Sequence, residues 1–210
     1  MRCIPPSVAC WEGDRAVRTV IITGIPGVGK TTILKEVEAL AREQNIKLTI
    51  LNFGTVVGEL YKKSNMNLHR DELRRQPIDV QKKMQLKAAR ILAKKVRNGI
   101  FLIDTHMFIR TKSGFWPGLP DSILSILKPS LLVLVEASPE EIVKRREGDS
   151  TRMRDEMTMY DVMSDLDWAR ASASSCANKS GVPVKIVLNE PGKQREAANE
   201  ILQSINELGG

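Results

Sequence analysis

The fold of this chain is decided by one short stretch, the sequence GIPGVGKT at residues 24–31. It fits the pattern G-x-x-x-x-G-K-T, and the residues on either side fit the structure that this pattern needs. An apolar, β-branched run at residues 20–22 is typical of a buried parallel strand, and residues 32–40 carry apolar side chains at helical spacing. A glycine loop between a strand and a helix turns backbone N–H groups and the positive end of the helix dipole toward a phosphate chain. The stretch therefore predicts a phosphate-binding loop (P-loop) rather than an ordinary glycine turn.

Three polar side chains suit the chemistry of a phosphate chain held in this loop. The ammonium group of Lys30 can reach the β- and γ-phosphates, and the hydroxyl of Thr31 can ligate Mg²⁺. Asp104 follows four apolar residues, where a carboxylate at the end of a strand would hold the same ion through water. The alternative for Asp104 is an aspartate that caps the next turn. We predict Mg²⁺ as the cofactor, with Thr31 and Asp104 at the metal.

Strand-like and helix-like segments alternate along the chain. Short apolar runs predict the strands, and apolar residues at helical spacing predict the helices between them. This alternation predicts an α/β P-loop NTPase fold, in which a five-stranded parallel sheet carries helices on both faces and ligands bind at the carboxyl ends of the strands. The strands are expected at residues 17–23, 46–52, 99–104, 131–136 and 184–188, and helices at residues 32–40, 79–97, 140–146, 160–180 and 195–208.

Composition narrows the class of protein. The chain has 210 residues, of which 42% are hydrophobic and 27% charged, as in an ordinary globular protein. This length favours one domain, at residues 17–210, after an N-terminal extension at residues 1–16 that we expect to be disordered. The three cysteines have no metal-ligand spacing, which favours a reducing, cytoplasmic compartment. No apolar run reaches the length of a membrane span.

Arginines gather in two separate groups. The first follows the fourth expected strand in the segment RREGDSTRMRD, residues 145–155. Guanidinium groups stabilise the negative charge that develops during phosphoryl transfer, and a closing loop expels water. The second group comprises Arg70, Arg74, Arg75 and Arg110. Two groups suit a reaction in which donor and acceptor both carry phosphate, although residues 70–75 also fit an exposed helix face.

We expect no catalytic role for His106 or for residues 111–120. His106 is expected to orient a neighbour by a hydrogen bond, because an ionised phosphate acceptor barely needs a general base. Residues 111–120 combine turn formers with Phe115 and Trp116, so they fit either the wall of a base pocket or a rigid loop that packs Trp116 into the core.

Taken together, these segments resemble the archaeal-type adenylate kinase family. The resemblance runs from about Arg18 to the C-terminus, in family order and spacing. Residues 1–16 have no counterpart in the family, and Phe115-Trp116 stands where a tyrosine and an aliphatic residue are common. The matching stretches are residues 23–32 (TGIPGVGKTT), 52–55 (NFGT), 70–74 (RDELR), 104–106 (DTH), 109–111 (IRT), 118–120 (GLP), 151–154 (TRMR) and 184–187 (VKIV).

The resemblance implies the reaction ATP + AMP ⇌ 2 ADP with Mg²⁺, a role in adenine nucleotide homeostasis and, in many family members, a trimer. It also implies an AMP-binding insertion near residues 53–77, a short arginine-rich lid near residues 147–157 and a contact of residues 189–193 with the ATP adenine. The implied ATP-binding residues are Gly24, Ile25, Pro26, Gly27, Val28, Gly29, Lys30, Thr31 and Thr32. The implied AMP-binding residues are Asn52, Gly54, Thr55, Arg74 and Arg110. The implied catalytic residues are Lys30, Arg145, Arg152 and Arg154, with Arg170 as a further candidate.

Four alternatives stay open beside this interpretation. A kinase for another nucleoside monophosphate would share the P-loop and the arginines. An ATPase or nucleotide-gated module acting on RNA or ribosomes would fit the net charge of +7, but only 4% of the residues are aromatic and none repeat beside basic runs, so we expect no nucleic-acid partner. A GTPase is disfavoured because Gly181 replaces the aspartate of the guanine-reading N-K-x-D pattern that Asn178-Lys179 begins. An ATP-dependent small-molecule kinase would not need the second arginine group.

Overall fold

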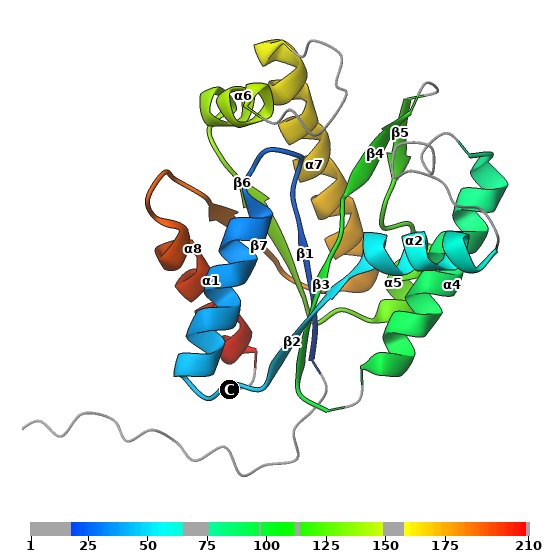
Figure 1. Ribbon diagram of the computed structural model, residues 1–210, viewed down its shortest axis with the longest axis horizontal. Coiled ribbons are helices and arrows are strands. Elements are labelled where there is room, and N and C mark those ends of the chain that lie inside the picture. The colour runs from blue at the N-terminus through cyan, green and yellow to red at the C-terminus, as the bar shows by residue number, and fades with distance from the viewer. Residues whose placement is uncertain (1–17, 65–75, 97, 112–113, 149–157, 209–210) are drawn as a thin grey trace, which may run out of the picture.

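The computed structural model describes residues 18–64, 76–96, 98–111, 114–148 and 158–208. A five-stranded parallel sheet forms its centre, with the strand order β2-β3-β1-β6-β7 (Figure 1). The predicted five-stranded parallel sheet is therefore confirmed. The strands are β1 (Arg18–Thr23), β2 (Leu48–Asn52), β3 (Ile100–Asp104), β6 (Leu131–Glu136) and β7 (Val184–Leu188).

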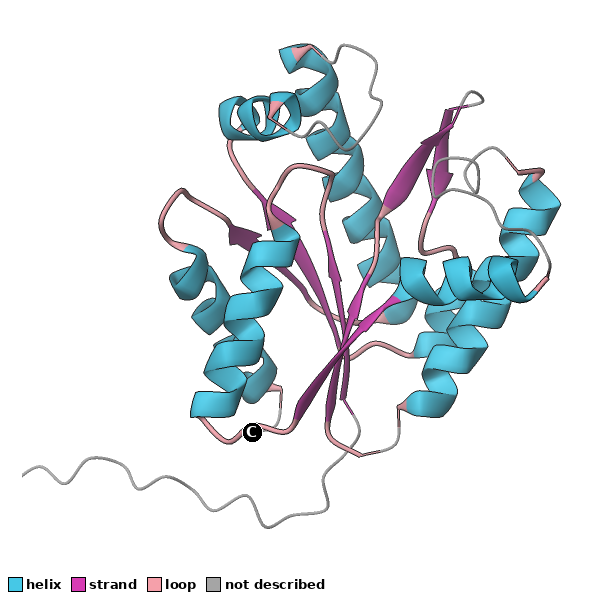
Figure 2. Ribbon diagram, in the orientation of Figure 1, coloured by secondary structure: helices cyan, strands magenta, loops and turns pink. Residues whose placement is uncertain are grey.

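Helices cover both faces of this sheet, as Figure 2 shows. Helices α1 and α8 pack together on one face, and α4, α5 and α7 lie on the other. The predicted helices are present, and their ends differ from the expected ones by a few residues. The helices are α1 (Lys30–Glu43), α2 (Phe53–Lys63), α4 (Ile78–Lys95), α5 (Asp121–Leu127), α6 (Pro139–Glu147), α7 (Met159–Ser180) and α8 (Gln194–Glu207).

The core lies along the three central strands. Every residue of β6 is buried, and Val20, Ile21 and Ile22 of β1 have no exposed surface. Strands that are covered on both faces need continuous apolar sequences, and this is why short apolar runs were sufficient to locate them. The central strands are rigid supports for the loops at their carboxyl ends.

Four elements were missed in the sequence. Helix α2 begins directly after β2, where Asn52 caps it by accepting a hydrogen bond from the backbone N–H of Thr55 at 2.8 Å. Strands β4 (Phe108–Thr111) and β5 (Gly114–Pro117) form an antiparallel hairpin where a loop was expected. Helix α5 has only seven residues. Elements this short contain too few residues for a periodic pattern to develop.

The buried side of α4 is not purely apolar. Val80 and Ile91 are only partly buried. The buried face instead includes two glutamines, Gln81 and Gln85, between apolar neighbours. Polar side chains are rarely found in the middle of the buried face of a helix. Their presence there suggests a functional use.

In the described part of the chain, none of the helices has the length and apolar character needed to cross a membrane. The predicted N-terminal extension at residues 1–16 lies outside the described residues.

Gly118 offers a test of how the base of the hairpin packs on the segment after β3. Its N–H donates to the Met107 carbonyl at 2.8 Å, and a Cβ atom at this position would collide with the carbonyl oxygen of His106. We expect Gly118→Ala to lower the free energy of unfolding by about 1–3 kcal/mol, because backbone cannot move away as a side chain can. Urea denaturation measures this change.

Gly58→Ala is the matched control for that substitution. Gly58 lies inside α2, and a Cβ atom there would meet nothing within 4 Å. We expect Gly58→Ala to raise the free energy of unfolding by about 0.5–1 kcal/mol, because alanine favours the helix. Equal effects of the two substitutions would contradict the close packing of Gly118 on His106.

Candidate active site

The P-loop joins β1 to α1 at the carboxyl edge of the sheet, where all its predicted residues lie (Figure 1). Gly27 and Gly29 have φ angles of +96° and +84°, a conformation that glycine adopts without strain. A Cβ atom on Gly27 would lie 3.1 Å from both Ile142 and Arg146, and one on Gly29 would collide with Asn189. No side chain caps α1, whose positive end therefore faces the loop.

Lys30 lies at the point where three strand ends meet. Its Nζ atom donates to Asp104 Oδ1 at 2.6 Å and to the Thr105 carbonyl at 2.9 Å, and the residue is only 8% exposed. Asn52 Nδ2 donates to the other carboxylate oxygen of Asp104 at 2.7 Å. Polar side chains and the P-loop lysine therefore meet at this edge of the sheet.

Thr31 and Asp104 can hold a magnesium ion. The hydroxyl of Thr31 is on an exposed residue in the first turn of α1, and the Asp104 carboxylate lies at the end of β3. Both offer oxygen atoms, the ligands that Mg²⁺ prefers. Each Asp104 oxygen keeps a lone pair after its bond to Lys30 or Asn52, so a water-mediated contact fits the donor set.

Arg145 is the predicted catalytic arginine that the structure brings to the P-loop. Its guanidinium donates to the carbonyls of Val28 at 3.1 Å and of Gly27 and Asn189 at 3.5 Å. The salt bridge to Glu141, one turn earlier in α6, spans 3.5 Å. The other two implied catalytic arginines, Arg152 and Arg154, and the implied AMP ligand Arg74 lie outside the described residues.

A buried chain of charges that was not predicted connects the P-loop with the hairpin. Arg146 donates to the Pro26 carbonyl at 2.8 Å and to Asp165 Oδ2 at 3.3 Å. The other oxygen of Asp165 accepts from Arg110 Nε at 2.8 Å. Asp165 is only 2% exposed, and it occupies the apolar face of α7 between Val162 and Ala169. A carboxylate inside that apolar pattern was the signal in the sequence that could have identified it.

Arg110 projects from β4 and has three neighbours. It is paired with Asp165 at 2.7 Å and with Asp161 at 3.8 Å, and its guanidinium carbon lies 4.9 Å from the centre of the Phe115 ring. Hydrogen bonds from Thr158 hold the pKa of Asp161 below its usual value, and Arg110 contributes to the same shift. Arg110 keeps a half-exposed side chain, so an anionic ligand can reach it.

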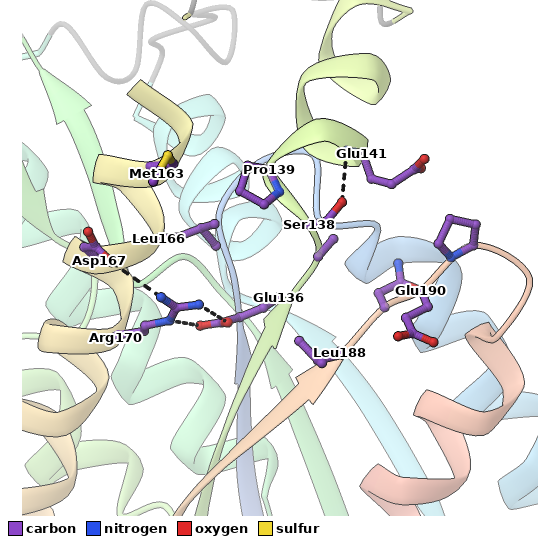
Figure 3. A pocket seen from close by; sticks show the side chains of 13 residues that line it. Glu136, Ser138, Pro139, Glu141, Met163, Leu166, Asp167, Arg170, Leu188 and Glu190 are labelled. Carbon is purple, nitrogen blue, oxygen red and sulfur yellow. Dashed lines mark hydrogen bonds and ion pairs between the residues drawn. The ribbon is translucent and has the colours of Figure 1, made fainter. Parts of the chain in front are cut away.

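Arg170, the further catalytic candidate that the resemblance implied, is bonded to a carboxylate at the end of β6. Its guanidinium forms two hydrogen bonds to Glu136, at 2.8 and 2.7 Å, and these bonds raise the pKa of Arg170 (Figure 3). Both side chains line a pocket of about 340 Å³ between the end of β6, α7 and the residues after β7. Arg170 therefore supports the carboxyl end of β6, and its bonds in the described residues do not reach the P-loop.

A second, smaller pocket of about 100 Å³ lies beside Asp104, between α2, α4 and the segment after β3. Gly54, predicted to bind AMP, lines this pocket, and so does His106. Asn52 and Thr55 are instead bonded to each other, and Asn52 also binds Asp104. The pocket is lined by Phe53, Gly54, Val57, Tyr61, Gln81, Gln85, Thr105, His106, Ile109 and Gly118.

The P-loop lies at the centre of a parallel α/β sheet, and its lysine is bonded to the carboxylate at the end of the neighbouring strand β3. This arrangement defines a P-loop nucleotide-binding protein. A family model described as "AAA domain" matches residues 23–162, which are more than half of the chain, so the chain belongs to that family. The solved structure of shikimate kinase from Bacteroides thetaiotaomicron covers 91% of this chain with a TM-score of 0.53. The match extends over 99% of the shikimate kinase chain, and the two sequences are 14% identical. It therefore shows a shared fold and no more.

Relatives of higher identity define the family more closely. An adenylate kinase from Sulfurisphaera tokodaii is 39% identical over 189 residues, covering 88% of this chain and 97% of the relative. An adenylate kinase from Pyrococcus horikoshii is 40% identical over 188 residues, with coverages of 89% and 94%. The chain belongs to the adenylate kinase family and is a phosphotransferase enzyme, which confirms the resemblance described above.

Proposed function

We propose that this protein catalyses the reversible, Mg²⁺-dependent transfer of the γ-phosphoryl group of ATP to AMP, giving two molecules of ADP, and so maintains the balance of adenine nucleotides. The position of Asp104 carries this proposal. One oxygen of its carboxylate binds Lys30 in the P-loop, and the other binds Asn52, which begins the helix that lines the smaller pocket. Two binding places on either side of one carboxylate suit a reaction between two nucleotides.

Each part of the site has a defined task in this proposal. The P-loop N–H groups bind the phosphates of ATP, and Lys30 stabilises the charge that develops on the transferred group. Arg145 adds a second cation beside the same loop. Thr31 and, through water, Asp104 would hold Mg²⁺, which would supply positive charge to the phosphates. The phosphate of AMP is already ionised, so the acceptor needs no general base, and His106 keeps a structural role.

Closure of the site involves residues 147–157 in this proposal. Arg152 and Arg154 belong to the proposed lid at residues 147–157, and lid closure would exclude water that otherwise hydrolyses ATP. Arg74 would bind the AMP phosphate together with Arg110. The proposed insertion, the single domain at residues 17–210, the trimer and the cytoplasmic location stay predictions, of which the trimer is tested by light scattering in solution.

The function is tested by measuring ADP formation from ATP and Mg²⁺, first alone and then with AMP, CMP, UMP or GMP. We expect rapid turnover only after AMP is added. Turnover with a different monophosphate would keep the mechanism and change the acceptor. Slow ATP hydrolysis that is indifferent to every monophosphate would overturn the proposal and favour the ATPase alternative.

Arg110→Ala tests the assignment of the acceptor phosphate. We expect this substitution to raise the KM for AMP by about 10- to 100-fold, because it removes a hydrogen-bonding cation from an anionic ligand, while the KM for ATP changes little. Initial rates with each nucleotide varied in turn measure both constants. Arg195→Ala, which breaks only surface pairs with Glu36 and Glu43, is the matched control. An equal rise in both KM values would mean that the two arginine groups are assigned wrongly.

A further inference from the structure

Asn189 packs its side chain against the P-loop. It lies directly after β7 and is only 2% exposed. Its Nδ2 atom donates a hydrogen bond to the Val28 carbonyl of the P-loop at 2.6 Å. A Cβ atom on Gly29 would collide with the same Nδ2 atom, so this glycine leaves the space that the amide occupies. The Asn189 amide is therefore in direct contact with the phosphate-binding backbone.

The bond to Val28 determines how one peptide of the P-loop is turned. The Val28 carbonyl and the Gly29 N–H belong to the same trans peptide unit, so they point in opposite directions. Because the carbonyl is bound to Asn189, the Gly29 N–H faces away from Asn189. Gly29 is the N-cap residue of α1, at the helix end where a P-loop binds phosphate. A fixed peptide at this place keeps a backbone donor oriented before the ligand arrives.

Asn189 is itself held by the carboxyl end of β6. Its backbone N–H donates to the Glu136 carbonyl at 2.8 Å. The Glu136 side chain is buried and accepts two hydrogen bonds from Arg170 of α7 (Figure 3). These contacts connect α7 through the end of β6 to the P-loop, and they give the Glu136–Arg170 pair a task in supporting that loop.

We propose that Asn189 is a positioning residue of the donor site: its amide fixes the Val28–Gly29 peptide so that the Gly29 N–H faces the phosphate chain of ATP. This inference rests on the proposed function, which puts ATP in the P-loop. Asn189 acts through the backbone of the loop and does not touch the transferred group. Its Oδ1 atom is buried without a hydrogen-bond partner among the described residues. A buried unsatisfied atom lowers stability, so the amide is better explained by its hold on the loop than by a contribution to the fold.

Arg145 explains why the loop needs this second donor. It donates to the same Val28 oxygen, at 3.1 Å. In the proposed function Arg145 is a cation for the phosphates of ATP, and turning toward them takes its guanidinium away from the carbonyl. Asn189 is uncharged and anchored through its own backbone, so its bond to Val28 persists when Arg145 moves. The loop therefore keeps its shape while the arginine serves the reaction.

The experiment removes the amide and measures the two halves of the site separately. Inorganic tripolyphosphate is the probe, because it has the phosphate chain of ATP and no base. In Asn189→Ala we expect the Kd of tripolyphosphate, measured by calorimetry with Mg²⁺, to rise by about 10- to 100-fold, since a displacement of about 1 Å in a binding group has effects of this size. The KM for ATP should rise by the same factor, and the KM for AMP should change little. A higher KM for ATP with an unchanged Kd of tripolyphosphate would place Asn189 at the nucleoside part of ATP and overturn the proposal.

A second variant separates the lost donor from other effects of the substitution. Asn189→Asp keeps the size of the side chain and loses its N–H donors, whereas Asn189→Ala leaves a space and adds no charge. The same selective loss in both variants would come from the missing donor. A loss confined to one of them would come from the space or the charge, and would overturn the proposal. Asn178→Ala and Asn178→Asp, at an exposed position in α7, are the matched controls and should leave all three constants unchanged.

The possible failures are distinguishable. Wild-type protein without AMP-dependent turnover would overturn the proposed function, while the binding of tripolyphosphate, which needs no turnover, would still test Asn189. Wild-type turnover with AMP, combined with an unchanged Kd of tripolyphosphate in both Asn189 variants, would overturn only the positioning role. Equal rises in the KM values for ATP and AMP would show that Asn189 supports the fold as a whole and does not position the P-loop.

Discussion

Lys30→Ala is expected to lower turnover by about 10²- to 10³-fold while the protein stays folded. The ammonium group is the cation of the P-loop that can stabilise charge on the transferred phosphoryl group, and losing a single such group commonly costs two to three orders of magnitude. The fold should persist because Asn52 still donates to Asp104 and the apolar core beneath the loop is unchanged. Steady-state rates of ADP formation and circular dichroism measure the two properties.

Lys35→Ala is the control for that experiment. Lys35 lies on the exposed side of α1, one turn after the P-loop lysine, so its loss removes an equal charge without touching the strand ends. We expect turnover close to that of the unmodified protein. Near-normal phosphoryl transfer by Lys30→Ala would rule out the P-loop mechanism.

Asp165→Ala is expected to lower the free energy of unfolding by about 3–5 kcal/mol, the usual effect of removing one partner from a buried ion pair. Arg146, whose side chain is only 6% exposed, would then lose its ion pair with Asp165. Arg110 would lose its closest carboxylate as well. Urea denaturation followed by circular dichroism gives the change in free energy. Asp165→Asn keeps one oxygen acceptor, so its free energy of unfolding should lie between those of the unmodified protein and Asp165→Ala.

Asp167→Ala is the matched control on the same helix. The Asp167 side chain is 76% exposed and forms a surface pair with Arg170 at 3.4 Å. Exposed pairs contribute about 1 kcal/mol or less, so the stability should change little. A loss below about 1 kcal/mol in Asp165→Ala would contradict the view that this buried carboxylate stabilises the two arginines.

Most of the fold could be predicted because its signals are local in the sequence. The central strands are continuous apolar runs, and Gly27 and Gly29 indicate the positive φ angles that the P-loop needs. The hairpin β4–β5 could not be predicted because its strands have four residues each and their pairing depends on packing. Helix α2 was missed although Asn52 is a strong capping residue, because the Phe-Gly-Thr sequence after it resembles a loop.

The candidate site was harder to predict than the fold. The P-loop, Asp104 and Arg145 follow from residue type and position, and the structure brings them together. Asp165 was missed because its partners Arg146 and Arg110 lie 19 and 55 residues away, and only the tertiary structure brings such residues into contact. Gln85 was missed because a polar residue in a helix is normally taken as exposed, and its burial depends on the neighbouring α2.

The carboxylate that Arg146 and Arg110 share also limits how this enzyme can diverge. A substitution of either arginine changes the charge that the other one faces, so the effects of changes at the two positions will not add. A lineage that substitutes Arg110 therefore also alters the surroundings of Pro26, which Arg146 binds. Relatives with a different residue at position 110 should carry a compensating change at position 165 or 146, and this covariation can be sought in an alignment.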